Sequence, residues 1–177
     1  MRMVLAATLA FLPHMALAVG SDDSQPPTPT QTTTECEKGT VWDEKTKTCI
    51  KAEESSLNDD QRFGAVRELA YAGRYAEATA VLAAMREGET SRVMTYQGFL
   101  LRQTGHVEEG IAAYERAIAL DPANILARSY YGQLLVQMDE LAMAGEQLAQ
   151  IRAHGGTGTW AEEALSNAIK TGVTYTF

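Results

Sequence analysis

Two histidines and two cysteines are the residues after position 20 that are best suited to catalysis or metal binding. His106 lies in a predicted turn, and His154 lies at a predicted helix end, where the carbonyl dipoles favour a positive imidazole. Neither histidine is spaced with carboxylates or with the other histidine in a metal-ligand pattern, and the sequence has no nucleophile-elbow, zinc-protease or phosphate-loop motif. We therefore expect no enzymatic activity, no cofactor and no metal site.

The two cysteines, Cys36 and Cys49, are the only ones in the chain and enclose a short, mostly polar loop. A zinc site needs about four ligands, which two cysteines without a nearby histidine cannot provide. The pair Val41-Trp42, followed by a polar stretch, predicts two short strands around a polar turn. A disulfide across the open ends would stabilise this hairpin by about 3 kcal/mol in the chain-entropy model. The expected unit is a disulfide-closed hairpin over residues 36–49.

Residues 1–18 have the layout of a secretory signal peptide. Arg2 gives a positive end, residues 3–15 form an apolar run, and an Ala-Leu-Ala sequence ends at Ala18 as a small-x-small cleavage site. The run is shorter than the roughly 20 residues of a membrane span and is broken by Pro13, which argues against a stable membrane anchor. We expect a periplasmic or secreted protein, and in either compartment cysteines oxidise.

The net charge argues against a nucleic-acid-binding protein, and the composition near the N-terminus predicts a linker. The formal net charge is −8 for the whole chain, and about −9 after loss of the leader with Arg2. Affinity for phosphate backbones comes from clustered Lys and Arg, which this sequence lacks, so no nucleic-acid partner is expected. Residues 19–35 are rich in Thr and Pro, have no aliphatic or aromatic residue after Val19, and are expected to form a disordered linker. A glycosylated or wall-spanning stalk is the alternative.

A complete helix-turn-helix unit occupies residues 91–124. Its first half places small and apolar residues at helical spacing and stops at Gly105, which can take the left-handed geometry that ends a helix. Its second half repeats such residues every three or four positions until Pro122 forbids further helix. The resulting antiparallel helix hairpin exposes apolar surface and therefore needs neighbours.

Neighbouring copies become visible when the chain is aligned on the turn of this unit. Gly73 precedes Gly105 and Asp139 follows it at nearly the same spacing, which is close to the length of the unit itself. A small residue follows the turn by five positions in each copy, where it lets two helices approach closely: Ala78, Gly110 and Ala144. Three repeats are therefore predicted within residues 58–154, at 58–90, 91–124 and 125–154.

The middle copy resembles the tetratricopeptide repeat. Gly98, Tyr114 and Pro122 match the glycine, the aromatic residue and the proline of the family pattern. The residues that replace its Trp, Leu, Tyr and Ala are Met94, Gln97, Leu101 and Gly110. The resemblance implies an all-α solenoid of antiparallel helix hairpins, in which the first helix of each pair lines a concave groove that binds peptides or proteins.

Capping signals flank the repeats. Asn58 and Gln61 predict a capping box at the start of the helical array, and Thr159 and Glu162 predict another after a glycine-rich break. Residues 159–172 are expected to form a helix with one apolar face that caps the stack. The tail, residues 173–177, alternates apolar and polar residues, and the sequence leaves open whether it lies against the stack, stays loose or acts as a recognition peptide.

The first helices of the three pairs supply the candidate partner-binding residues. Each of these helices has a face that is expected to be uncommitted, that is, to stay free of core packing. The candidate residues on these faces are Arg67, Tyr71, Arg92, Phe99, Arg102, Gln103, Gln133 and Gln137, and the same faces also carry Phe63, Thr95 and Ser129. Arginine makes forked bonds to carboxylates, aromatic rings give flat apolar contact, and glutamine can bond to a peptide backbone. Arginines gathered on one face of an acidic protein predict an acidic segment or a chain terminus as ligand.

The expected function is an exported interaction module or scaffold that holds a peptide or protein partner, and end-to-end packing of the repeats would add a homo-oligomer. The alternative is a cell-wall or glycan-binding accessory protein that acts through residues 36–49. This segment resembles the core of small chitin-binding modules of the peritrophin type, with Trp42 in the place of a sugar-stacking aromatic. The competing role for Trp42 is packing against the disulfide or the first helix.

Overall fold

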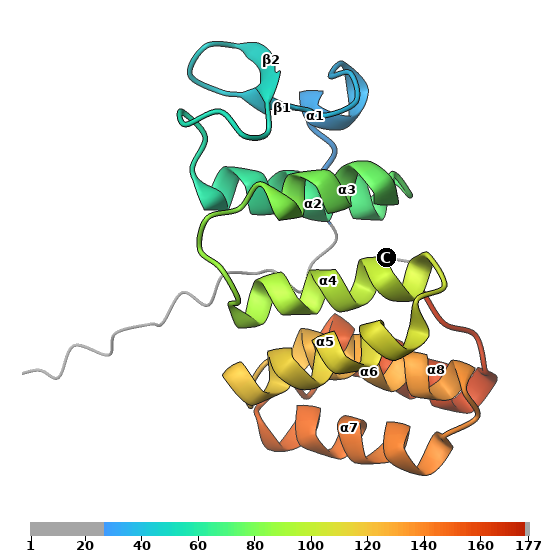
Figure 1. Cartoon of the computed structure of the whole chain (residues 1–177). Helices are drawn as coiled ribbons and strands as arrows, with labels where there is room; N and C mark the ends of the chain where they lie inside the picture. The colour runs from blue at the N-terminus through green and yellow to red at the C-terminus, as the bar shows by residue number, and fades with distance from the viewer. Residues whose placement is uncertain (1–26, 176–177) are drawn as a thin grey trace, which may run out of the picture.

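Helices packed in consecutive pairs make up most of the protein, and a small two-stranded hairpin precedes them in the chain and lies above them in Figure 1. The computed structural model describes residues 27–175. Within that range the elements are α1 (Gln31–Thr34), β1 (Thr40–Asp43), β2 (Thr48–Lys51), α2 (Asp59–Tyr71), α3 (Tyr75–Ala83), α4 (Ser91–Gln103), α5 (Val107–Leu120), α6 (Ile125–Gln137), α7 (Leu141–Ala153) and α8 (Trp160–Thr171). The predicted helical fold with a disulfide-closed hairpin is confirmed.

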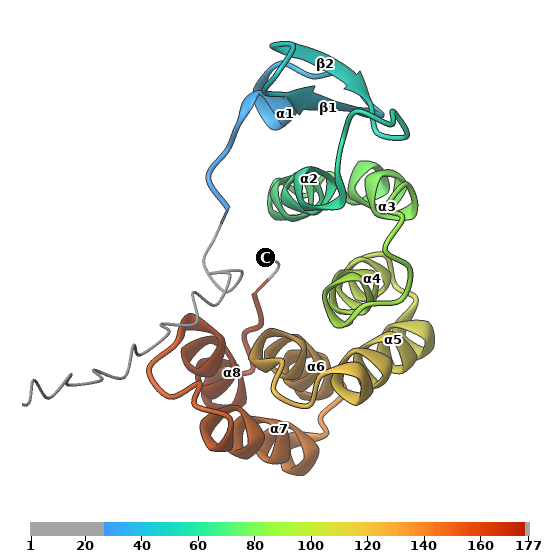
Figure 2. The ribbon, with the colours of Figure 1, turned by 90° about the vertical axis from the view of Figure 1, so that its left-hand side faces the viewer.

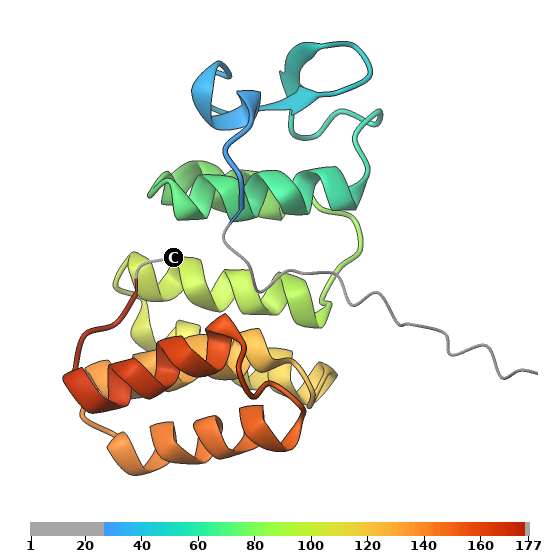
Figure 3. The same cartoon turned by 180° about the vertical axis from the view of Figure 1, so that it is seen from behind.

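The pairs α2–α3, α4–α5 and α6–α7 follow one another along an arc, seen nearly end-on in Figure 2. Helices α2, α4 and α6 lie on the inner side of the arc, and α3, α5 and α7 lie on the outer side. Helix α8 packs against α6 and α7, and the view from behind shows it alongside the last pair (Figure 3). It therefore lies where a helix that covers the end of the stack is expected.

The three pairs turn in the same way. The turn residues Gly73, Gly105 and Asp139 all have left-handed backbone, with φ angles of 73°, 84° and 63°. Glycine adopts this geometry without steric cost, whereas other L-residues lose roughly 1–2 kcal/mol in it, and Asp and Asn are the side chains that tolerate it best. The third turn thus has the geometry of the other two with a residue less suited to it.

Small residues set the distance between helices. A Cβ atom added at Gly98 would lie 2.7 Å from the Tyr114 ring, and one at Gly110 would lie 3.4 Å from the α4 backbone. Ala78 and Ala144, which correspond to Gly110 in the other pairs, are fully buried. The small residues therefore lie where helices approach closely, as the alignment predicts.

The hairpin is attached to the helical core. Strands β1 and β2 pair antiparallel, and the Cys36–Cys49 disulfide joins α carbons 5.5 Å apart. Val41 on β1 and Leu57 before α2 are buried in the same apolar cluster as Phe63 of α2. The hairpin therefore shares a core with the first helix pair.

Residues 19–35 do not all form a disordered linker, and the prediction is wrong for residues 27–35. Thr30 caps α1, and Thr30 and Thr33 each donate from backbone and hydroxyl to the Glu68 carboxylate of α2, at 2.6 Å from the Thr30 nitrogen. Glu68 is only 5% exposed, so these donors satisfy a buried acid. Residues 19–26 and the predicted signal peptide lie outside the described residues.

Helix caps agree in part with their predictions. Asn58 and Gln61 make both bonds of a capping box at α2. At α8, Thr159 accepts from the Glu162 amide, but the Glu162 carboxylate binds Arg152 and the Gly158 amide instead of closing the box. The second box is therefore half formed. Across residues 27–175, no helix combines the length and apolarity needed to cross a bilayer.

Candidate functional site

An aromatic row runs along the inner helices of the arc. It consists of Phe63, Tyr96, Phe99, Tyr130, Trp160 and Tyr175, drawn from α2, α4, α6, α8 and the C-terminal segment. Centroids of successive rings are 5.3, 6.1, 5.0, 6.3 and 6.2 Å apart, and the rings meet edge-on or tilted, as aromatic pairs prefer. The row links the inner helices into one apolar wall, which we call the inner wall.

Several candidate binding residues are part of this wall and not of a free surface. Phe99 is 1% exposed, Arg102 7% and Gln133 0%. The same holds for the other residues assigned to the uncommitted face, which are Phe63, Thr95 and Ser129. The expectation that this face is uncommitted is therefore wrong for these residues. Phe63 and Phe99 pack within the aromatic row, and Ser129 donates to the Ala161 carbonyl of α8.

The C-terminal segment Val173–Tyr175 lies against the inner wall. Beyond α8 the chain turns toward the inner side of the arc (Figure 2). The Tyr175 backbone N–H donates to Gln133 Oε1 at 2.9 Å, and Gln137 Nε2 donates to Thr174 Oγ1 at 2.7 Å. Two of the candidate binding residues thus hold a segment of the same chain. The sequence leaves open whether the tail lies against the stack, stays loose or acts as a recognition peptide. Its described part, residues 173–175, lies against the stack.

Arg102 belongs to the same hydrogen-bond network. Its Nε donates to Gln137 Oε1 at 2.9 Å, so Gln137 bridges Arg102 and Thr174. The Nη1 and Nη2 atoms of Arg102 are buried near the Tyr114 hydroxyl and make no hydrogen bond of ordinary geometry in the part of the chain that the structure describes. Burial lowers the pKa of Arg102, and the nearby Tyr114 opposes this effect. Because a guanidinium stays charged at neutral pH, these nitrogens suit an anionic acceptor such as a carboxylate.

The remaining candidates are more accessible. Arg92 binds Glu87 and Asp60, both at 2.7 Å, and lies 4.8 Å over the Phe63 ring. The hydrogen bonds that Arg92 donates to the Glu87 carboxylate raise the pKa of Arg92, so this charge is committed within the chain. Tyr71 and Gln137 are exposed, while Arg67 and Gln103 are half-buried. The structure therefore brings together Gln133, Gln137 and Arg102 at one site and does not bring Arg92 to it.

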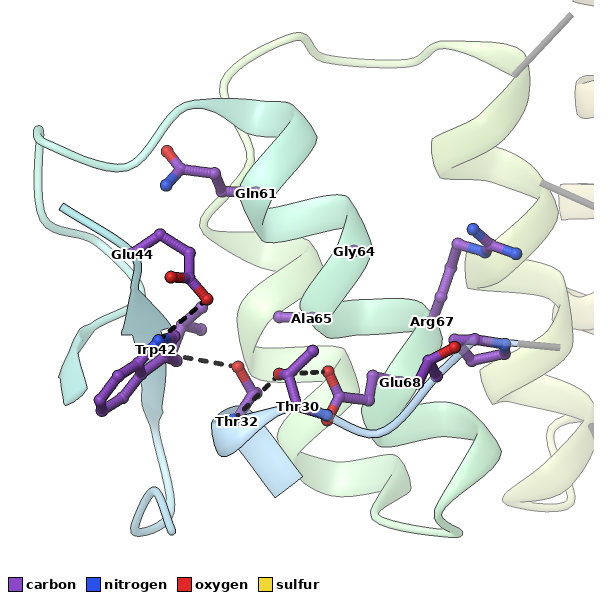
Figure 4. A pocket seen from close by; sticks show the side chains of 12 residues that line it. Thr30, Thr32, Trp42, Glu44, Gln61, Gly64, Ala65, Arg67 and Glu68 are labelled. Carbon is purple, nitrogen blue, oxygen red and sulfur yellow. Dashed lines mark hydrogen bonds between the residues drawn. The ribbon is translucent and has the colours of Figure 1, made fainter. Parts of the chain in front are cut away.

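A pocket of about 300 Å³ lies between the hairpin, the N-terminal segment and α2 (Figure 4). Its polar and aromatic lining includes Trp42 and Glu44 from the hairpin, Thr30 and Thr32 from the N-terminal segment, and Gln61, Arg67 and Glu68 from α2. Gly64 also lines it, and a Cβ added there would meet nothing within 4 Å. Of this set, the sequence singles out Trp42 as a possible sugar contact, Arg67 as a candidate for the inner face of the repeats and Gln61 only as a helix-capping residue.

The Trp42 indole is held in place at the pocket. Its Nε1 donates to Glu44 Oε1 at 3.1 Å, and its backbone N–H donates to Thr32 Oγ1 at 3.2 Å. A hydrogen bond from Lys47 lowers the pKa of Glu44, so an ionised carboxylate lies beside the ring at neutral pH. A flat apolar ring next to an acceptor group can bind a ligand that has an apolar face and hydroxyl groups.

The two histidines are exposed and take no part in either site. Over residues 27–175, no three His, Cys, Asp or Glu side chains gather as a metal site would require. The two sites offer hydrogen-bonding groups and aromatic rings, together with the buried charges of Arg102 on the inner wall and Glu68 at the pocket.

The described helix pairs have a repeat-like arrangement, with equivalent turns at Gly73, Gly105 and Asp139. Two candidate sites result, one on the inner wall and one beside the hairpin. Comparison with known proteins found no family model, no curated protein and no solved structure that matches this chain.

Proposed function

We propose that the protein is a polypeptide-binding module of tetratricopeptide-repeat type, whose inner wall takes an extended segment of a partner protein. The observation that carries this proposal is the contact of Val173–Tyr175 with Gln133 and Gln137, in which the wall engages both backbone and side chain of a peptide segment. A bond to a backbone N–H is available from almost any segment, so the same wall can hold a foreign one.

The orientation of Gln133 supports this role. The Ser129 hydroxyl donates to the Ala161 carbonyl at 2.7 Å, and Gln133 Nε2 donates to the Ser129 oxygen at 3.4 Å. These bonds direct Gln133 Oε1 toward the C-terminal segment as an acceptor that is fixed before a ligand arrives. Binding groups fixed in advance lose less conformational entropy on binding.

The charge of Arg102 and the disulfide refine the proposal. A carboxylate in the partner would supply the acceptors that Arg102 Nη1 and Nη2 lack, which supports an acidic peptide segment as ligand. The Cys36–Cys49 bond fits an oxidising compartment, and together with the leader-like N-terminus it supports a periplasmic or secreted location. The repeat-like pairs, with Gly98 packed under Tyr114, support the relationship to the repeat family.

Photo-crosslinking in cells tests the proposal. A benzophenone amino acid in place of Gln137, which is exposed beside the segment, is expected to trap a polypeptide, and an excess of the peptide Val-Thr-Tyr-Thr-Phe is expected to reduce the yield in extracts. The matched control carries the same group at Glu146, which is exposed on the outer helix α7. Equal adducts at both positions, or no adduct at Gln137, would contradict binding at the inner wall.

The pocket beside Trp42 favours a second candidate function, the binding of a glycan. Its volume of about 300 Å³ is at the lower end of the range for small-ligand sites. The fixed indole offers a flat surface to the apolar face of a sugar ring, and Glu44 and Gln61 offer hydrogen bonds to hydroxyl groups. The open backbone at Gly64 leaves room for a ligand to approach α2.

Retention on insoluble chitin or peptidoglycan tests this second function. Trp42→Ala is expected to abolish retention, because it removes the ring that the sugar would contact. Trp42→Phe keeps a ring but loses the bond to Glu44, so it is expected to retain part of the binding. If Trp42→Ala is retained as well as the unsubstituted chain, the pocket does not bind these glycans.

A further inference from the structure

The contacts of the C-terminal segment define a class of ligand for the inner wall. We propose that the wall selects extended segments in which a serine or threonine is followed directly by an aromatic residue, and that Thr174 and Tyr175 occupy this site until such a partner displaces them. The proposal rests on the proposed polypeptide-binding function and specifies both its partner and its regulation.

The hydroxyl preference follows from the orientation of Gln137. Arg102 has only hydrogen-bond donors, so the Gln137 atom that faces Arg102 Nε at 2.9 Å is the amide oxygen. The Gln137 amide nitrogen then points at the segment and requires an acceptor, which Thr174 Oγ1 supplies at 2.7 Å. An aliphatic side chain in this place would give up the hydrogen bond from Gln137, so the site favours Ser or Thr.

The backbone requirement follows from Gln133. Its amide nitrogen is engaged by Ser129, so its oxygen accepts the N–H of Tyr175 at 2.9 Å. A proline at this position has no N–H to donate and is excluded. Gln133 and Gln137 lie one helical turn apart on α6, so one face of this helix contacts two consecutive ligand residues.

The aromatic preference follows from Trp160. The Tyr175 ring lies 6.2 Å from the Trp160 ring at an interplanar angle of 62°, as the last member of the aromatic row. An aromatic ligand side chain continues a row that already spans α2 to α8, whereas a small side chain would leave the Trp160 edge uncovered. Gln137, Gln133 and Trp160 together therefore recognise a hydroxyl group, a backbone N–H and an aromatic ring, in that order along the ligand.

The tethered segment competes with any external ligand. Only a few residues separate Gly172, the C-cap of α8, from Tyr175, and a short tether gives the segment an effective concentration on the order of millimolar. An external peptide that makes the same contacts therefore binds the intact chain roughly ten-fold more weakly than a chain whose segment is disabled. A partner that also pairs with Arg102 makes an interaction that the described part of the segment lacks.

Fluorescence anisotropy with a defined peptide tests the inference. The probe is labelled Val-Thr-Tyr-Thr-Phe with both ends capped, and the protein is the full chain with Thr174→Ala and Tyr175→Ala together. The double variant is expected to bind the probe roughly ten-fold more tightly than the unsubstituted chain. The matched control is Val173→Ala, which changes an exposed residue of the same segment and is expected to bind like the unsubstituted chain.

Three substituted forms of the probe peptide test the selectivity of the site at each position. One peptide replaces the threonine at the second position by valine, and two others replace the tyrosine at the third position by alanine or by proline. Each replacement is expected to weaken binding to the double variant by about five-fold or more. Equal binding by the double variant and the unsubstituted chain would overturn the competition. Equal binding of all the peptides would overturn the selectivity while leaving polypeptide binding standing. Failure of every peptide overturns the inference, and failure of crosslinking at Gln137 as well removes the proposed function.

Discussion

Replacing Tyr114 by alanine is expected to lower the free energy of unfolding by about 3–5 kcal/mol. Tyr114 is fully buried on α5, its ring covers Gly98 of α4, and it stacks on Tyr131 of α6 at 6.0 Å. Its removal leaves a cavity where three helices meet, and close-packed neighbours fill such a cavity only in part. Domains of this size are stable by only about 5–15 kcal/mol, so urea denaturation followed by circular dichroism will show a large shift in midpoint.

The control for this result is Tyr114→Phe. The Tyr114 hydroxyl is buried, burial raises its pKa while nearby Arg102 opposes this effect, and it makes no hydrogen bond of ordinary geometry within residues 27–175. Removing the hydroxyl while keeping the ring is therefore expected to change stability by less than about 1 kcal/mol. A loss as large as that of the alanine variant would mean that the hydroxyl, and not the ring, supports the pair.

The Cys36→Ser, Cys49→Ser double variant is expected to lose about 3 kcal/mol of stability. The bridge closes a loop with a sequence separation of 13, and a two-stranded hairpin alone is marginal in water. The loss should be concentrated in β1 and β2, whose amides are expected to exchange with solvent faster while those of α4 to α7 change little. Hydrogen exchange measured by NMR, together with urea denaturation, distinguishes the local effect from the global one.

Reduction of the unsubstituted chain provides the control for the serine variant. Both should show the same loss, because both remove only the covalent link. If β1 keeps its protection in both cases, then the packing of Val41 and Leu57 on α2 holds the hairpin without the bridge. That outcome would contradict the stabilisation expected from loop closure.

Local patterns in the sequence predicted the helices and turns because those features depend on neighbouring residues. Gly73 and Gly105 end helices by left-handed geometry, and alignment on them located Asp139, whose backbone takes the same form. The small residues at Gly98 and Gly110 likewise indicated where helices pack closely. Each of these signals is contained in one repeat or in the spacing between repeats.

Features that depend on distant contacts were not predictable in this way. The composition of residues 27–35 gave no sign that Glu68, which lies far along the chain on α2, would order them. The burial of Phe99 and Gln133 depends on how tightly the arc curves, which periodicity does not specify. Similarly, Trp42 could be identified as an aromatic candidate, but Glu44 and Gln61 join it only through packing. One missed signal was Gly64, a helix-disfavouring residue inside α2 with no packing partner.

The bond between the N-terminal segment and Glu68 also determines how the molecule bears mechanical load. Thr30 and Glu68 are joined by hydrogen bonds, and the intervening stretch carries the hairpin and the disulfide. Tension applied to the chain before Thr30 is therefore transmitted directly to α2 across this contact. We expect the hairpin between them to be shielded from the pulling force until the threonine contacts rupture.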